Sequence, residues 1–164
     1  MKKRIIALGL LWCLSAVMLQ AARVDTVLVR SAAMNKDVKV VYVLPDKAIG
    51  KQACPVVYLL HGYGGNARSW VQLKPELPQM ADEKGIIFVC PDGKNSWYWD
   101  SPENPAYRYE TFVTSELVKY TDGNYATIPD RKARAISGLS MGGHGALWSA
   151  IRHKDVFGAA GSMS

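Results

Sequence analysis

The segment Gly138-Leu-Ser-Met-Gly142 carries the residue types best suited to covalent chemistry. It follows a strand-like run at 133–137 and opens into a helix-forming segment that starts at Gly143. A G-x-S-x-G turn between a strand and a helix holds its serine on a sharp bend, with Oγ exposed above the sheet. Glycine is needed on both sides because a side chain there would collide with the neighbouring strand or helix. We therefore predict that Ser140 is a nucleophile in acyl transfer, rather than part of a chance glycine-containing loop.

An acyl-transfer site also needs N–H donors for the negative charge that develops on the attacked carbonyl oxygen. In this arrangement one donor is the backbone N–H after the nucleophile, here that of Met141, and the other comes from the loop after the first central strand. The loop His61-Gly-Tyr-Gly-Gly65 follows the apolar run 55–60, and the backbone N–H of Tyr63 is the candidate there. Read alone, this loop could also be a plain glycine turn. Because ligands bind outside the carboxyl ends of strands in open α/β sheets, we expect both donors beside Ser140.

The elements that must position these groups follow from hydrophobic patterning. The chain is predicted to be α/β and three-layered, with an antiparallel hairpin at a sheet edge followed by parallel strands. The expected strands are 24–29, 38–44, 55–60, 86–90, 133–137 and one that begins at 157. The expected helices are 70–84, shortened or kinked by its prolines, then 109–120, and one from the G-x-S-x-G turn to about residue 154.

Composition indicates one globular domain. The 164 residues are 49% hydrophobic and 21% charged, which is ordinary for a folded domain and excludes a disordered chain. The formal net charge is +6, but Lys2, Lys3 and Arg4 carry three of these charges and the remaining basic residues are scattered. We therefore expect no nucleic-acid partner.

Residues 1–22 are predicted to be a secretory signal, followed by a domain at 23–164. The basic residues at 2–4 precede an apolar stretch at 5–19, and Ala21 and Ala22 offer a cleavage site. The apolar stretch is shorter than the roughly 20 residues needed to span a bilayer, so an uncleaved anchor is the less favoured alternative. We expect an exported protein, periplasmic or extracellular, without a stable membrane anchor.

The mature domain would keep two cysteines, Cys54 and Cys90. Cys54 begins one predicted strand and Cys90 ends the next, so in parallel neighbours they lie at opposite ends. That separation exceeds the roughly 7 Å that a disulfide permits between Cα atoms. Two buried free thiols are expected, and no cluster of residues has the spacing of a metal site.

One alternative motif overlaps the first loop. Gly62-Tyr-Gly-Gly-Asn-Ala67 follows a strand and fits a loose G-x-G-x-x-A dinucleotide-binding pattern. Prolines break the helix that should open there, and an exported protein seldom meets nicotinamide cofactors. We therefore expect no cofactor.

Four blocks of this chain resemble the esterase D group of α/β-hydrolases, which includes S-formylglutathione hydrolases, feruloyl and acetyl-xylan esterases, tributyrin esterases and mycolyltransferases. The blocks are His61-Gly-Tyr-Gly-Gly65, Ser96-Trp-Tyr-x-Asp100, Tyr109-Glu-Thr-Phe-Val-Thr-Ser-Glu-Leu117 and Gly138-Leu-Ser-Met-Gly-Gly-His-Gly-Ala-Leu147. The resemblance implies the α/β-hydrolase fold, Ser140 as nucleophile, and Tyr63 and Met141 as oxyanion donors. It further implies a secreted serine esterase acting on small acyl esters or carbohydrate-linked feruloyl or acetyl esters. Acyl transfer of the mycolyltransferase type, or a non-catalytic carbohydrate-binding module, are the alternatives.

The chain departs from that pattern in lacking a suitable base. A serine hydrolase needs a carboxylate and a histidine after the nucleophile. His144 and His153 lie on the helix that leads away from Ser140, and His61 lies in the oxyanion loop. We therefore expect the acid and base beyond residue 164, so that the chain is the N-terminal part of a longer hydrolase, lacks its C-terminal strands and is inactive alone.

The remaining candidates have structural explanations beside the functional ones. Trp97 and Tyr98, in the aromatic loop 94–106, could bind substrate or simply anchor the loop. Asp92, in Pro-Asp-Gly, is predicted to form a turn rather than to act as catalytic acid. Glu110 and Glu116 are interpreted as ordinary helix residues.

Overall fold

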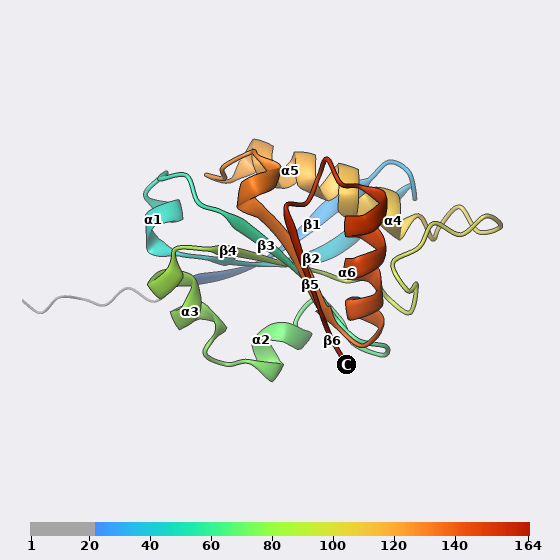
Figure 1. Ribbon diagram of the computed structural model, residues 1–164, viewed down its shortest axis with the longest axis horizontal. Coiled ribbons are helices and arrows are strands. Elements are labelled where there is room, and N and C mark those ends of the chain that lie inside the picture. The colour runs from blue at the N-terminus through green and yellow to red at the C-terminus, as the bar shows by residue number, and fades with distance from the viewer. Residues whose placement is uncertain (1–21) are drawn as a thin grey trace, which may run out of the picture.

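The computed structural model describes residues 22–164, and the predicted signal lies outside them. It contains a six-stranded sheet with helices on both faces (Figure 1). The strands are β1 Arg23–Ser31, β2 Lys36–Leu44, β3 Val56–Leu60, β4 Ile87–Pro91, β5 Arg134–Leu139 and β6 Ala159–Met163. The α-helices are α1 Asp46–Ile49, α2 Ser69–Leu73, α3 Leu77–Lys84, α4 Tyr109–Thr111, α5 Leu117–Asn124 and α6 Met141–Arg152, with a π-helical turn at Phe112–Glu116 and a 3₁₀ turn at Arg131–Ala133.

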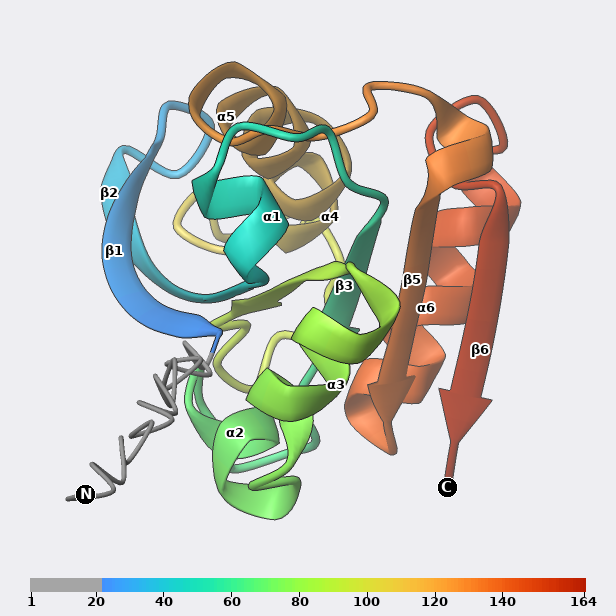
Figure 2. The ribbon, with the colours of Figure 1, turned by 90° about the vertical axis from the view of Figure 1, so that its left-hand side faces the viewer.

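The strand order is β1-β2-β4-β3-β5-β6. β1 and β2 form an antiparallel hairpin at one edge, β2 pairs antiparallel with β4, and the four strands from β4 to β6 run parallel. Figure 2 shows the hairpin at one edge and β6 at the other. The predicted hairpin, parallel strands and three layers are all confirmed.

Each face of the sheet carries its own hydrophobic core, because successive side chains of a strand point to opposite faces. Val40 and Tyr42 of β2 belong to the core under α4, α5 and α6, whereas Val41 and Val43 belong to the core over α2 and α3. Figure 1 shows these two helix groups on opposite sides of the sheet. Burial on both faces explains why the parallel strands are continuously apolar.

The helix expected at 70–84 is two helices. α2 ends at Leu73, and α3 begins at Leu77 after a break that contains Pro75. Proline lacks the N–H that would continue the helix, so the predicted interruption is confirmed. Gly85 then terminates α3 with φ 61°, a left-handed conformation that favours glycine.

The helix expected at 109–120 extends to Asn124 and includes the π-helical turn. Within this helical segment, Glu116 makes contacts with the β1–β2 hairpin that its interpretation as an ordinary helix residue did not predict. Its carboxylate accepts hydrogen bonds from Ser31 Oγ at 2.5 Å and from the Ala33 backbone N–H at 2.8 Å. Glu116 therefore ties the β1–β2 hairpin to the helical layer.

Cys54 and Cys90 are buried free thiols, as predicted. Burial raises the pKa of both thiols, so neither is a nucleophile at neutral pH.

Within residues 22–164, no helix has the length and apolar character needed to cross a membrane.

Two glycine substitutions test the helix ends. A Cβ at Gly123 in α5 would meet no atom within 4 Å, so Gly123→Ala should raise the free energy of unfolding by about 0.5 kcal/mol. Gly85→Ala should lower it by about 1 kcal/mol, because alanine is strained in the left-handed conformation. Urea unfolding of the two variants measures both changes, and equal effects would contradict the assigned helix ends.

Candidate active site

Ser140 sits at a strained turn between β5 and α6. Its φ of 53° is positive, which is uncommon for a residue with a side chain, and the serine is exposed to solvent. Its backbone N–H donates to Met163 O at 2.7 Å, which ties the turn to β6. A Cβ on Gly138 would lie 2.3 Å from the Gly142 carbonyl carbon, so the predicted steric need for these glycines is confirmed.

The turn lies directly against the end of β3. A Cβ on Gly142 would lie 2.2 Å from Leu60 O and 2.7 Å from His61 O, so only glycine permits this approach. A Cβ on Gly62 would lie 3.7 Å from Ser140 Cβ. The structure therefore brings the 61–65 loop and the 138–142 turn together at the carboxyl ends of β3 and β5.

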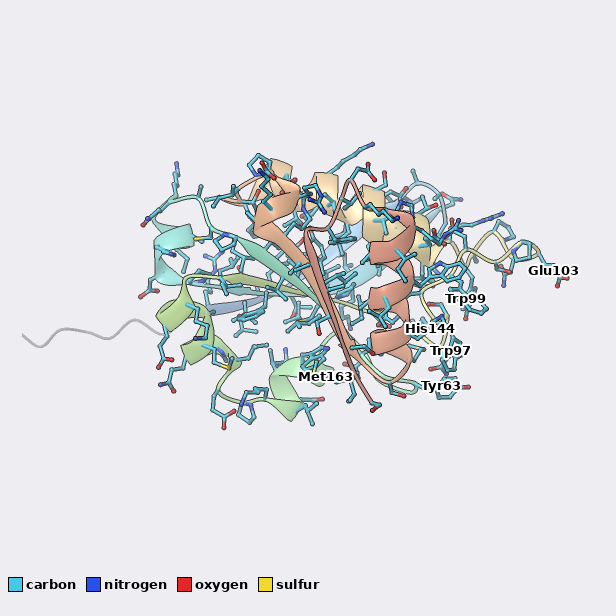
Figure 3. All side chains as sticks on the ribbon, viewed as in Figure 1. Tyr63, Trp97, Trp99, Glu103, His144 and Met163 are labelled. Atoms are coloured by element: carbon cyan, nitrogen blue, oxygen red, sulfur yellow. The ribbon has the colours of Figure 1, made fainter. Side chains whose placement is uncertain are left out.

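Both predicted oxyanion donors belong to this junction. Met141 is the first residue of α6, where a backbone N–H has no acceptor within the helix. Tyr63 follows Gly62 in the adjacent loop, and its side chain is 67% exposed. Figure 3 shows Tyr63 at the end of the molecule where the turn into α6 lies. Helix N-termini favour negative charge, which suits an oxyanion.

His61 is buried and organises the loop rather than acting as a base. Its Nδ1 lies 2.7 Å from Gly62 O, and the Gly93 N–H donates to its Nε2 at 2.9 Å. A carbonyl can only accept and an amide N–H can only donate, so the ring is a neutral tautomer with the proton on Nδ1. Both ring nitrogens are therefore occupied.

Tyr98 is fully buried, so the structure places it behind the loop and not on a surface where substrate could contact it. Its hydroxyl accepts the His61 backbone N–H at 2.9 Å and donates to His61 O at 3.3 Å. Burial raises the pKa of Tyr98 well above its usual value, which keeps the hydroxyl protonated for that donation. Tyr98 is one of the two aromatic residues predicted to bind substrate. The structure instead shows that it supports the loop that carries Tyr63.

Trp97, the other predicted contact, is 44% exposed and borders the site. Its ring packs edge-on against His144, with centroids 5.5 Å apart. Two residues earlier, Asn95 Oδ1 accepts the Gly64 N–H at 2.8 Å. The aromatic loop therefore holds the 61–65 loop at two points, His61 through Tyr98 and Gly64 through Asn95.

Asp92 forms a turn, as predicted, because its Oδ1 accepts the Lys94 backbone N–H at 2.9 Å. Its carboxylate also lies 3.7 Å from His61 Nε2 and 2.8 Å from Lys94 Nζ. Burial acts to raise the pKa of Asp92, but the hydrogen bonds and the positive charge of Lys94 outweigh it and lower the pKa. Asp92 is thus an ionised structural residue.

None of the three histidines of the chain is free to activate Ser140. His144 Nε2 accepts the indole N–H of Trp99 at 2.9 Å, and His153 Nε2 lies 2.8 Å from Glu110 Oε1. His61 is bonded as described above. A general base must hold an acceptor nitrogen toward the serine hydroxyl, so no histidine of this chain fills that role.

Glu110 is the centre of a buried polar cluster, which its interpretation as a helix residue missed. Its carboxylate accepts from Trp148 Nε1 at 2.8 Å and Arg152 Nε at 2.7 Å, besides the His153 contact. Burial acts to raise the pKa of Glu110, but these partners lower it. The partners lie about forty residues away in sequence, so no local pattern could reveal them.

Residues 22–164 hold no group of three His, Cys, Asp or Glu side chains placed to bind a metal.

The family model named Esterase matches residues 31–164. The chain belongs to this esterase family. An acetyl esterase from Caldicellulosiruptor saccharolyticus is 28% identical, over 77% of this chain and 50% of that protein. The diacylglycerol acyltransferase/mycolyltransferase Ag85A of Mycobacterium gordonae is 34% identical, over 86% of this chain and 42% of that protein. The chain spans about half the length of the curated relatives it matches.

Solved structures establish the fold of this esterase-family chain. A ferulic acid esterase superposes with a TM-score of 0.70 at 31% identity, covering 85% of this chain and 56% of that one. An S-formylglutathione hydrolase from Agrobacterium tumefaciens gives a TM-score of 0.75 at 26% identity, covering 88% and 61%. The α/β-hydrolase fold is confirmed, and the glycines at 62–65 belong to the 61–65 loop beside Ser140.

Removing the Tyr98 hydroxyl tests its role in holding the loop. Tyr98→Phe leaves the His61 backbone N–H buried without this acceptor, so the free energy of unfolding should fall by about 1–3 kcal/mol. Tyr107→Phe is the matched control, because this more exposed hydroxyl makes no hydrogen bond within residues 22–164. Chemical denaturation compares the two variants, and an equal loss in both would contradict the proposed anchoring.

Proposed function

We propose that this chain carries the nucleophile half of a secreted serine carboxylic-ester hydrolase. The observation that supports it best is the strained, exposed Ser140 packed against Gly62 of the oxyanion loop. Backbone strain at a side-chain-bearing residue persists only where the surrounding structure enforces it, and it is concentrated at functional sites. A module that only binds carbohydrate would have no use for this turn.

In the proposed reaction Ser140 Oγ attacks the ester carbonyl carbon and loses its proton to a histidine from outside residues 1–164. The carbonyl oxygen becomes an oxyanion that accepts the N–H groups of Tyr63 and Met141. The C–O bond to the alcohol then breaks, and the histidine returns the proton to the departing alcohol. Water attacks the acyl-enzyme by the same steps, which releases the acid and restores Ser140.

The substrate class is proposed from the chemistry that the relatives' names state. An acetyl esterase and a ferulic acid esterase both cleave carboxylic esters, with small and aromatic acyl groups respectively. We infer a small acyl ester or a carbohydrate-linked feruloyl or acetyl ester for this protein. Export, proposed from the basic and apolar residues 1–22, fits polysaccharide-linked substrates outside the cytoplasm.

Acyl transfer is the second candidate, favoured by the 34% identity to Ag85A, whose name states that activity. The acyl-enzyme would be the same, but a sugar hydroxyl would replace water in the second step. With p-nitrophenyl acetate and glucose as acceptor, a transferase forms acetyl-glucose, whereas a hydrolase releases acetate in the same amount as p-nitrophenol.

A fluorophosphonate probe tests the nucleophile directly. In the full-length protein that carries this chain, we expect labelling of Ser140 and hydrolysis of p-nitrophenyl acetate. Ser140→Ala should abolish labelling and lower kcat by more than about 1000-fold, because the nucleophile, its base and the oxyanion donors act as a unit. Peptide mass spectrometry locates the label.

The isolated chain 1–164 is the control, and it should show little turnover because its histidines are bonded elsewhere. Robust hydrolysis by this chain, lost on Ser140→Ala, would show that a base lies within it. A full-length protein that fails to react with the probe would favour the non-catalytic binding module.

A further inference from the structure

A line of side chains runs along α6 away from the nucleophile. Ser140, His144, Trp148 and Arg152 are each four residues apart, so they lie along one side of the helix. At 1.5 Å of rise per residue, the line extends about 18 Å from the serine. Such a length exceeds any acetyl group and matches an extended substrate.

Two tryptophans of the 94–106 loop flank this line. The Trp99 ring centroid lies 5.3 Å from that of His144 and 5.5 Å from that of Trp148, and Trp97 packs on His144 as described above. Figure 3 shows Trp97, Trp99 and His144 gathered beside α6, between Tyr63 and the tip of the loop. We call the group of Trp97, Trp99, His144, Trp148 and Arg152 the aromatic track.

Hydrogen bonds hold the rings of the aromatic track in place and leave ring surface open. The indole N–H of Trp99 is bonded to His144, and that of Trp148 to Glu110. Trp99 nevertheless remains 45% exposed. A ring that is fixed before binding loses little conformational entropy when a ligand stacks on it.

A pocket of about 350 Å³ opens at the far end of the track, lined by Trp99, Asp100, Glu110, Trp148 and Arg152. Arg152 Nε is bonded to Glu110, and the guanidinium carbon lies 4.9 Å from the centre of the Trp148 ring. Within residues 22–164, the Arg152 side chain makes no hydrogen bond through Nη1 or Nη2, and it is 54% exposed. These two groups are therefore available as donors to a ligand.

The charges of this pocket select against an anion. Two carboxylates, those of Asp100 and Glu110, face a single guanidinium. Asp100 already accepts the backbone N–H and Oγ1 of Thr111, and Glu110 accepts the bonds described above. A sugar carboxylate would meet net negative charge, whereas neutral hydroxyls can both donate to carboxylates and accept from a guanidinium.

We propose that the aromatic track is the subsite for a neutral oligosaccharide, the carbohydrate portion of the ester substrate. The apolar faces of the sugar rings stack on the exposed rings of Trp97 and Trp99, and hydroxyls bind the Nη groups of Arg152. This inference rests on the proposed esterase function and specifies its substrate as an ester of an uncharged polysaccharide. The track also defines where that polysaccharide lies, along α6 and away from β3.

Isothermal titration calorimetry tests the track without turnover, with the full-length protein carrying Ser140→Ala. The ligands are xylohexaose and cellohexaose, which are neutral, and hexagalacturonate, which is acidic. At least one neutral hexaose should bind, and more tightly than hexagalacturonate. Trp99→Ala and Arg152→Ala should each weaken that binding about tenfold, as the loss of a tryptophan or arginine anchor does in other binding sites.

Ile151→Ala is the matched control, because Ile151 lies next to Arg152 on α6 with 66% exposure and outside the track; it should leave the binding constant unchanged. Trp99→Phe keeps an aromatic face and should retain most of the affinity, which separates stacking from loss of folding. The proposal is overturned if neither neutral hexaose binds, or if hexagalacturonate binds more tightly than both. It is also overturned if the Trp99→Ala and Arg152→Ala variants keep the affinity of the parent protein.

Failure of carbohydrate binding by the aromatic track can be told apart from failure of the proposed esterase function. A full-length protein whose Ser140 reacts with the fluorophosphonate, but which binds no neutral hexaose, overturns the track alone. A protein that binds a neutral hexaose through Trp99 and Arg152, but does not react with the probe, supports the track and overturns the esterase proposal.

Discussion

The contact between the Ser140 turn and the end of β3 is the constraint on which the rest of the site depends. Gly142 lies so close to the carbonyls of Leu60 and His61 that no side chain fits between them. This is a contact of backbone with backbone, so it has no flexible side chain that could relax and change the spacing. It sets the distance between Ser140 and the 61–65 loop, and oxyanion stabilisation depends on donors held in advance at the right position.

The loop opposite the serine needs its own support, because a glycine-rich segment has little intrinsic preference for one conformation. The support is polar and largely buried: the Tyr98 hydroxyl on the His61 backbone, the His61 ring between Gly62 and Gly93, and Asn95 on Gly64. Buried polar groups stabilise a unique conformation only when they are all paired, and here each group has its partner. The 94–106 segment is therefore part of the framework of the proposed active site, although it contributes none of the proposed reacting atoms.

The sequence predicted most of the fold because its signals are local. Apolar runs, the prolines after Leu73 and the G-x-S-x-G turn each act within a few residues, and the structure contains the elements that they predict. The inward position of Tyr98 could not be predicted. Trp97 and Tyr98 both have positive φ, at 56° and 60°, which is uncommon for residues with a side chain and which no local sequence pattern predicts. The cluster around Glu110 was missed for a different reason, since its partners come from α6.

Helix α6 joins the two halves of the proposed activity. Its first N–H, that of Met141, is a proposed oxyanion donor, and its side carries the aromatic track, so one rigid element would set the distance between the reacting ester and the bound carbohydrate of the proposal. The same arrangement explains why His144, one turn from the nucleophile, is not the base. Its acceptor nitrogen is bonded to Trp99, and that bond orients an indole of the track. A base taken from this side of the helix would compete with carbohydrate binding, so the proton acceptor is best supplied from the opposite side of Ser140.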